Sequence, residues 1–290
     1  MLHTNTTDVQ NSLEACIYYT GVVSLTLVVS CGVLGFIGNC FLLFYQYNLS
    51  KYTTSDVFIT TLSLLDLLYN AIGVGIMSWF DCTMMIFGDT HKKISVKIVS
   101  YACCFFAFSD LCLLFLLSLD RFIAVYFPFS TKRNIKNAQW QVRILLGLLV
   151  AAVYITWHWR PLFYSIYFIS AGIIGIYACI LSKILCRNKN SNKGLSIKEL
   201  KLTMNCAVLS IMAVLLLIPC TLAFVLGLNS VQAYFTDRFG DCSLFILVAL
   251  IHHPLLGLNF TIHPYLLFMT SSRYQKGGSR SNTQSTTTAS

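Results

Sequence analysis

Three ionisable residues stand inside long apolar runs of the sequence, where charged groups are rare. They are Asp66, Asp110 and His263. A charge alone at the centre of a bilayer costs roughly 3 kcal/mol or more, so such residues pair with one another, hold an ion or share a proton. We expect chemistry of that kind here. Acid–base catalysis is not expected, because nothing in the sequence indicates a route for a substrate, and we predict that the protein is not an enzyme.

A second chemical group lies where another apolar run ends, at the adjacent residues Asp120 and Arg121. The guanidinium of arginine stays charged in proteins and offers five N–H donors. At a membrane boundary such a charge needs partners. Asp120 is the nearest acid in the sequence.

The composition limits the class of protein that holds these groups. The 290 residues are 56% hydrophobic and only 11% charged, and the mean hydropathy is +0.70. About a quarter of the residues in a soluble domain are charged, so this chain has too few charges to cover a water-soluble fold. Soluble enzymes and nucleic-acid binders are thereby excluded, and the formal charge of +9 is better read from its placement along the chain.

Seven apolar runs are each long enough to cross a bilayer, which needs about 20 residues per helix. They must be helical, because lipid offers no partner to a free N–H or C=O group. Pro161 favours a break between the fourth and the fifth run. The runs are Ile17–Tyr45, Val57–Phe80, Ile98–Phe127, Ile144–Trp159, Leu162–Leu185, Cys206–Leu228 and Ser243–Met269.

The basic residues predict the orientation. With the N-terminus outside, fifteen Lys and Arg residues fall on the cytoplasmic side and five outside, as the positive-inside rule requires. We therefore predict an all-α membrane protein, a seven-transmembrane helix bundle with N-terminus outside and C-terminus inside. Residues 1–16 form an extracellular segment without a cleaved signal peptide, 17–269 the helical domain, and 270–290 a cytoplasmic Ser/Thr-rich tail. Asn5 begins a glycosylation sequon on the outer side.

The segment from Leu117 to Pro128 resembles the Asp-Arg-Tyr signature of rhodopsin-like (class A) G-protein-coupled receptors, with Phe122 in place of Tyr. The resemblance covers nearly the whole chain outside the tail. Other segments that are similar to motifs of this family are Gly38-Asn39, Leu62–Leu68 around Asp66, Tyr177 with Ile180, Pro219, and Asn259 with His263-Pro264.

Several positions depart from the family pattern. His263 replaces the Asn before Pro264, and Leu217 replaces the Trp before Pro219. Val96 stands at the helix-three position of the usual disulfide, so that bridge cannot form. These departures leave the resemblance intact but alter the residues expected to take part in activation.

The resemblance implies a site for a heterotrimeric G protein around Arg121. It places Glu199 at the cytoplasmic start of the sixth helix, where it would pair with Arg121 and latch the bundle shut; the other interpretation is that Glu199 balances neighbouring lysines on a solvated face. Phe129 would enter the G protein from the second cytoplasmic loop, and Tyr177 would lie at the cytoplasmic end of helix five. The tail could be phosphorylated by a receptor kinase and recruit arrestin, or be a plain disordered segment.

The resemblance also implies that Asp66, Asp110 and His263 converge in one pocket, with Asn39, Asn70 and Asn259 nearby. Two close carboxylates do not both ionise readily, so the pocket needs a shared proton, a sodium ion at Asp66 and Asp110, or a positive His263. It would act as a cation- or proton-dependent switch, or be a polar network that only packs the bundle. No other cofactor is expected.

The extracellular ligand is poorly specified. Cys103 and Gly257 replace the residues that amine receptors and visual pigments of the family use, which argues against a biogenic amine and against retinal. A small apolar or aromatic molecule, a lipid or a short peptide fits better. The candidate pocket residues are Cys103, Phe106, Tyr164, Tyr167, Phe224, His252 and His253.

The extracellular cysteines are Cys16, Cys82 and Cys242, and one disulfide among them is expected in that oxidising compartment. Taken together, the sequence predicts a multi-pass receptor of the plasma membrane that couples an extracellular ligand to a G protein. The alternatives are a proton- or cation-linked transporter or channel, and a degenerate receptor that needs no ligand.

Overall fold

The computed structural model describes residues 6–48, 53–87, 92–127, 160–187, 197–236 and 248–270, together with Trp140, Arg143 and Gly147. These ranges are helical except at Asn48, Thr53 and Phe127, and they contain no strand. The elements are α1 (Thr6–Tyr47), α2 (Thr54–Leu68), η1 (Tyr69–Gly73), α3 (Val74–Phe87), α4 (Lys92–Tyr126), α6 (Arg160–Arg187), α7 (Ile197–Thr236), η2 (Val248–His252) and α9 (His253–Thr270).

Helix α2 begins at a capping box. The Thr53 side chain accepts a hydrogen bond from the Asp56 backbone N–H, and the Asp56 carboxylate accepts one from the Thr53 backbone N–H at 2.7 Å. This pairing satisfies backbone donors that have no partner within the first turn of a helix. The helix then continues through the π-helical turn η1 into α3, because the N–H of Val74 donates to the carbonyl oxygen of Tyr69. A single π turn in a long helix changes the direction in which the following side chains point.

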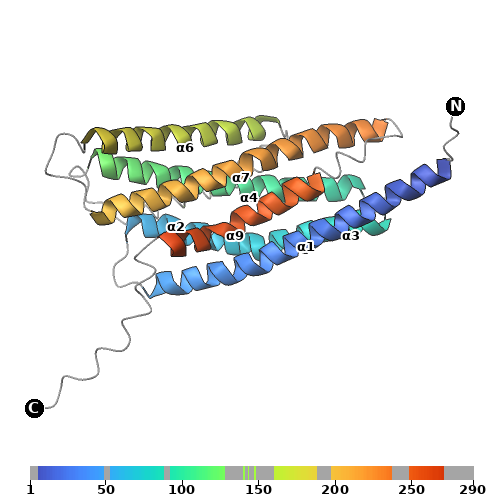
Figure 1. The fold of residues 1–290 in the computed structure, drawn as a ribbon, viewed down its shortest axis with the longest axis horizontal. Helices are drawn as coiled ribbons and strands as arrows, with labels where there is room; N and C mark the ends of the chain where they lie inside the picture. The colour runs from blue at the N-terminus through green and yellow to red at the C-terminus, as the bar shows by residue number, and fades with distance from the viewer. Residues whose placement is uncertain are drawn as a thin grey trace, which may run out of the picture.

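The long helices run roughly along one axis, and successive helices reverse direction except for α4 and α6, which run the same way (Figure 1). The end of α1, the start of α2, the ends of α4 and α6, the start of α7 and the end of α9 lie at the same end of the bundle. Consequently Asp120 and Arg121, near the end of α4, face the first turn of α2, while Asp66 and Asp110 lie deeper along the same two helices.

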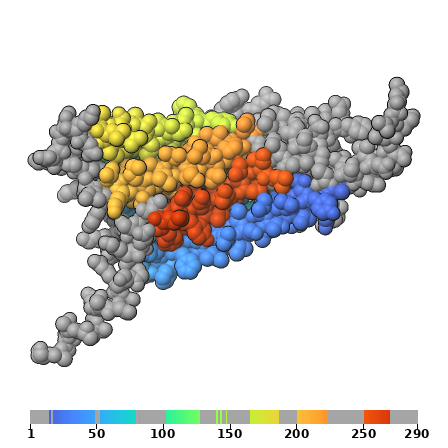
Figure 2. Space-filling model, viewed as in Figure 1, coloured from blue at the N-terminus to red at the C-terminus, as the bar shows by residue number. Residues whose placement is uncertain are grey.

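Helices α7 and α9 lie between α6 and α1 on one face of the molecule (Figure 2). Helix α1 packs closely on α9, and Gly38 allows this contact, since a Cβ atom there would lie 2.9 Å from the ring of Pro264. Three side chains also cross the interface to backbone carbonyls. Thr261 donates to Cys31 at 2.8 Å, Tyr265 donates to Leu34 at 2.9 Å, and Asn39 donates to Phe260 at 3.2 Å.

The core consists of apolar side chains from all the long helices, with an aromatic group at its centre. Tyr69 is fully buried and stacks on Phe260 with ring centroids 4.1 Å apart. Phe106 meets Tyr69 edge-on at 5.2 Å. These rings join η1, which directly follows the helix of Asp66, to α4 and α9, the helices that carry Asp110 and His263.

Five helices in the described part of the chain are long and apolar enough to cross a membrane, which indicates a membrane-embedded protein. They overlap the predicted first, second, third, fifth and sixth spans. Helix α9 lies within the predicted seventh span except for its last residue, Thr270, but is not among the five, because two histidines, two prolines and Asn259 lower its hydropathy. The predicted fourth span, 144–159, lies almost wholly outside the described residues.

Candidate functional site

Arg121 lies near the end of α4 with its side chain fully buried. Its guanidinium forms an ion pair with the neighbouring Asp120, to which Nε donates at 3.0 Å and the terminal nitrogen donates as well. The Asp120 side chain is only 13% exposed. Removing a guanidinium from water is costly unless its charge is balanced by such hydrogen-bonded partners.

Asp120 is held in turn by the first turn of α2. The hydroxyl of Thr54 donates to Oδ1 of Asp120 at 2.9 Å, and the hydroxyl of Ser55 donates to Oδ2 at 2.8 Å. Both carboxylate oxygens therefore accept hydrogen bonds from another helix, and Oδ2 also accepts from Arg121. This arrangement fixes the guanidinium indirectly, by fixing its counter-ion.

The other predicted coupling residues are described only in part. Glu199 belongs to the first turn of α7, but its side chain lies outside the described part of the structure, so the Arg121–Glu199 pair stays a prediction. Phe129 lies outside the described residues. Tyr177 is buried in α6, and its hydroxyl lies 3.4 Å from Oγ of Ser210 in α7. That contact joins two helices near the end at which Arg121 lies.

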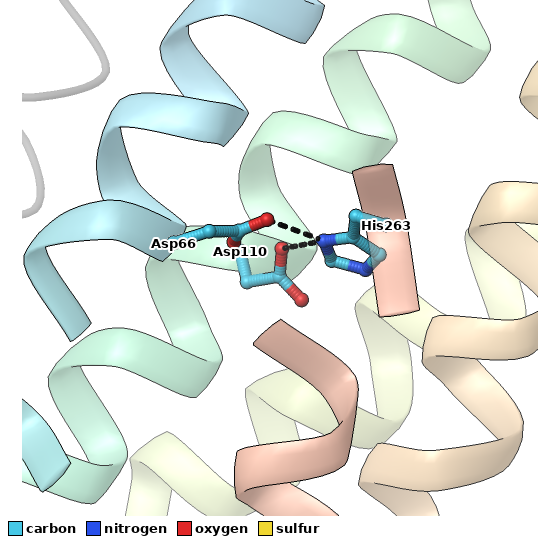
Figure 3. Close-up of side chains that lie close together, drawn as sticks. All are labelled: Asp66, Asp110 and His263. Atoms are coloured by element: carbon cyan, nitrogen blue, oxygen red, sulfur yellow. Dashed lines mark hydrogen bonds and ion pairs between the residues drawn. The ribbon is translucent and has the colours of Figure 1, made fainter. Parts of the chain in front are cut away.

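The structure brings Asp66, Asp110 and His263 together from α2, α4 and α9, with both carboxylates turned toward one imidazole (Figure 3). Nδ1 of His263 lies 2.9 Å from Oδ2 of Asp66 and 4.0 Å from Oδ1 of Asp110. One potential ligand atom from each residue lies within 4.8 Å of the others. All three side chains are at most 1% exposed.

The asparagines expected near this pocket differ in their contacts. Nδ2 of Asn259 donates to Oδ2 of Asp110 at 2.7 Å, which places its amide at the site. Asn39 donates to the carbonyl oxygens of Gly35 and Phe260 and so joins α1 to α9. Asn70 lies in η1, one turn beyond Asp66, and approaches Gly35, where an added Cβ atom would lie 2.6 Å from its Nδ2.

The pocket has more hydrogen-bonding atoms than the described residues satisfy. Oδ1 of Asp66, Oδ1 of Asp110 and Oδ1 of Asn259 are buried without a hydrogen-bond partner among the described residues. Two carboxylates also face one imidazole, so the site carries net negative charge even when His263 is charged and both acids are ionised. A buried site of this kind can take up a cation or a proton, and either would lower the cost of its excess negative charge.

The candidate ligand-pocket residues whose side chains are described make packing contacts. Phe106 belongs to the aromatic core, and Sγ of Cys103 lies 3.7 Å from Sδ of Met77. His252 lies in η2, and its Nδ1 is 2.9 Å from the carbonyl oxygen of Cys220, the residue after Pro219. His253 is also buried.

Among the remaining ligand-pocket residues, Tyr167 has a described side chain. The hydroxyl of Thr221 lies 3.5 Å from that of Tyr167. The side chains of Tyr164 and Phe224 lie outside the described part of the structure. The role of this whole set in ligand binding therefore stays a prediction.

The structure describes the side chain of Cys82, one of the three cysteines considered for the predicted disulfide. Cys82 is a free thiol, as is every other cysteine whose side chain the structure describes. This removes Cys82 from the expected pairings. The side chains of Cys16 and Cys242 lie outside the described part, and so do Asn5 and the Ser/Thr-rich tail beyond Thr270.

Sequence reasoning missed the hydroxyl pair that holds Asp120. Thr54 and Ser55 are ordinary residues for a first helical turn, and nothing in the sequence aligns that turn with the end of α4. The capping box was detectable, because Thr53 and Asp56 have the required spacing. Locating the cap would have placed the two hydroxyls at the start of the helix but not beside Asp120.

Comparison with known proteins adds no family assignment, because no protein-family model and no curated protein matches this chain.

Proposed function

We propose that this protein is a rhodopsin-like G-protein-coupled receptor of the plasma membrane, with its N-terminus outside. An extracellular ligand would shift a pre-existing equilibrium between closed and open bundles, and a heterotrimeric G protein would bind the open one. The observation that carries the proposal is the fully buried Arg121, held near the end of α4 by a counter-ion that α2 fixes in place.

The geometry supports a switch at this end of the bundle. A buried guanidinium has five donors and a permanent charge, so any rearrangement that exposes it creates a strong binding group for carbonyl and carboxylate oxygens. Pairing with Glu199 would add a second restraint, from the first turn of α7. Outward movement of α7 would separate Tyr177 from Ser210 and open a cleft beside Arg121. Phe129 would then complete the contact with the G protein.

The distribution of basic residues supports the orientation. Lys183, Arg187, Lys198 and Lys201 belong to the ends of α6 and α7 that lie at the Arg121 end of the bundle. An excess of Lys and Arg marks the cytoplasmic side of a membrane protein. Arg121 would therefore face the compartment that contains G proteins, and arrestin and a receptor kinase would act there on the tail.

The test is a G-protein activation panel in cells, run without ligand and with a chemical library, on wild type, Arg121→Ala and Lys201→Ala. Lys201 lies exposed on α7, so its replacement removes one positive charge from the same end of the bundle and leaves the Asp120–Arg121 pair intact. We expect Arg121→Ala to reduce activation at least tenfold at equal surface expression, and Lys201→Ala to retain it. Equal activation by wild type and Arg121→Ala would contradict the coupling assignment.

The buried pocket of Asp66, Asp110 and His263 would bias the closed against the open bundle by holding a sodium ion or a proton. Replacing Asp110 by Ser leaves one carboxylate facing one imidazole, a pair that can balance its own charge. We therefore expect Asp110→Ser to flatten the dependence of basal activity on sodium and on pH. An unchanged profile at normal surface expression would leave the pocket with a packing role only.

The same three residues favour one alternative, a proton- or cation-linked transporter or channel. Ionisable residues inside a membrane commonly mark ion pathways. Ion flux through wild-type protein in sealed vesicles, lost in Asp110→Ser and insensitive to Arg121→Ala, would support that function in place of the receptor.

A further inference from the structure

We propose that Asp66, Asp110 and His263 bind one divalent transition-metal ion, of the class of Zn²⁺, Co²⁺ or Mn²⁺, with the Asn259 amide oxygen as a further donor. This inference deepens the proposed cation-dependent switch by assigning it a transition-metal ion in place of sodium, and it rests on the proposal that the pocket holds a cation. The donors, their spacing, their charge and their unpaired atoms each support it.

The donor set contains a nitrogen. Alkali and alkaline-earth ions are bound in proteins almost entirely by oxygen atoms, whereas imidazole suits first-row transition ions such as Zn²⁺ and Co²⁺. Nδ1 of His263 is the atom that faces both carboxylates, at 2.9 Å from one and 4.0 Å from the other. A sodium ion among these residues would be next to a donor it does not favour.

The spacing of the three atoms suits small ions. Metal–nitrogen and metal–oxygen bonds of about 2.1 Å place adjacent ligand atoms about 3.0 Å apart and opposite ones about 4.2 Å apart. The distance from Nδ1 of His263 to Oδ2 of Asp66 is 2.9 Å, and that to Oδ1 of Asp110 is 4.0 Å. Both distances are therefore close to those that one six-coordinate ion of this size would impose, and the two carboxylate oxygens, which lie within 4.8 Å of each other, would need to approach by a few tenths of an ångström at most.

The charge of the site favours a divalent over a monovalent ion. A ligating imidazole is neutral and ligating carboxylates are ionised, so Asp66, Asp110 and His263 together contribute two negative charges. A divalent ion balances them fully. Sodium would leave one negative charge uncompensated among side chains that are at most 1% exposed, and an unbalanced buried charge is costly.

Unpaired donors are also present at the site. Oδ1 of Asp110 faces Nδ1 of His263 and has no hydrogen-bond partner among the described residues. Oδ1 of Asn259 has none there either, while the other amide atom of Asn259 is already bound to Asp110. A metal ion would satisfy these oxygens and leave the Asn259–Asp110 hydrogen bond intact, in which Asn259 orients the ligating carboxylate.

The experiment uses the purified full-length chain in lipid nanodiscs, stripped with a chelator and titrated with Co²⁺ in 150 mM NaCl, about physiological ionic strength. Visible ligand-field absorption and equilibrium dialysis report the coordination and the stoichiometry. We expect one Co²⁺ per chain in the presence of sodium, and a higher temperature of thermal unfolding when the ion is bound. Binding of sodium alone, or no Co²⁺ bound at this stoichiometry, would overturn the proposal.

Variants locate the site. His263→Asn keeps oxygen donors but removes the nitrogen, and we expect it to weaken Co²⁺ binding at least tenfold. His252→Asn is the matched control, because it removes another buried imidazole, bound to Cys220 in a different part of the bundle, and should bind Co²⁺ like wild type. If His252→Asn lost Co²⁺ binding and His263→Asn kept it, the ion would lie elsewhere and the assignment would be overturned.

A measurement on the wild-type chain covers the case in which His263→Asn does not fold. Pulsed electron paramagnetic resonance of bound Mn²⁺ should show coupling to one imidazole nitrogen, and a spectrum without nitrogen coupling would contradict the site. These measurements contain no G protein. Normal G-protein activation without metal binding would remove this inference alone, whereas metal binding without G-protein activation would remove the receptor proposal and leave the metal site.

Discussion

The two buried charged sites of this molecule differ in how their charges are balanced. Near the end of α4, one guanidinium faces one carboxylate, and both oxygens of Asp120 accept hydrogen bonds from α2 hydroxyls. Deeper in the bundle, two carboxylates face one imidazole, and Oδ1 of each acid has no hydrogen-bond partner among the described residues. The first site is balanced by its own residues, whereas the second carries excess negative charge.

The difference indicates how each site responds to change. A balanced buried pair is costly to break from one side, because the remaining charge stays buried without its partner. A site with excess charge gains from anything that supplies positive charge or removes a carboxylate. We therefore expect neutralisation of an acid to have opposite effects on stability at the two sites.

The largest effect is expected for Asp120→Ala. It leaves the Arg121 guanidinium buried without its described counter-ion and should lower the free energy of unfolding by about 3 to 5 kcal/mol. Thermal unfolding of purified protein in detergent, followed by tryptophan fluorescence, measures the change. Asp120→Asn loses the charge but keeps atoms that form hydrogen bonds. Its free energy of unfolding should therefore lie between those of wild type and Asp120→Ala. Wild-type stability in both variants would show that the pair does not hold this end of the bundle.

A smaller loss is expected for Ser55→Ala. The hydroxyl donates to an ionised carboxylate, and such a hydrogen bond contributes about 1.5 to 3 kcal/mol. Ser63→Ala is the matched control, because Ser63 lies buried in the same helix and its hydroxyl donates to the carbonyl oxygen of Ile59 within that helix, with no other bond among the described residues. Similar losses in the two variants would indicate that the α2 hydroxyl adds nothing specific to the Asp120 pair.

The smallest effect, and the one of opposite sign, is expected for Asp110→Asn. In chelator-treated buffer of low ionic strength, the change removes one buried negative charge and keeps an oxygen that can accept from Asn259. Stability should rise by about 1 kcal/mol, because the site then buries one carboxylate beside the imidazole in place of two, and relief of unbalanced buried charge is stabilising by at least this amount. Adding metal ions should stabilise wild type but not the variant. A loss of stability similar to that of Asp120→Asn would contradict the claim that neutralising an acid has opposite effects at the two sites.

The apolar runs predicted most of the helices, since burial in lipid requires uninterrupted apolar sequence. They did not predict the helix ends, because hydropathy reports only the part of a helix that meets lipid. Helix α7 begins at Ile197, nine residues before the predicted Cys206, through a polar segment that extends beyond the apolar part. The π turn at Tyr69 was also missed, because no pattern of residue types specifies it.

The candidate sites, like the helices, were predictable from the sequence only in part. Asp66, Asp110 and His263 are conspicuous in the sequence as ionisable residues in apolar runs, but their meeting in space was expected only from a family resemblance. The partners of Asp120 were not expected at all, since hydroxyls at positions 54 and 55 gain a role only when α2 lies against α4. Residue chemistry therefore pointed to the sites, and helix packing determines what each residue contacts.

The most direct test of the central claim is nucleotide exchange on purified heterotrimeric G proteins of each class, catalysed by the chain in nanodiscs. Arg121→Ala and Lys201→Ala are compared with wild type at equal amounts of folded protein. The account predicts that wild type and Lys201→Ala accelerate exchange on at least one class and that Arg121→Ala does not. Acceleration by Arg121→Ala equal to that of wild type, or none by wild type on any class, would contradict it.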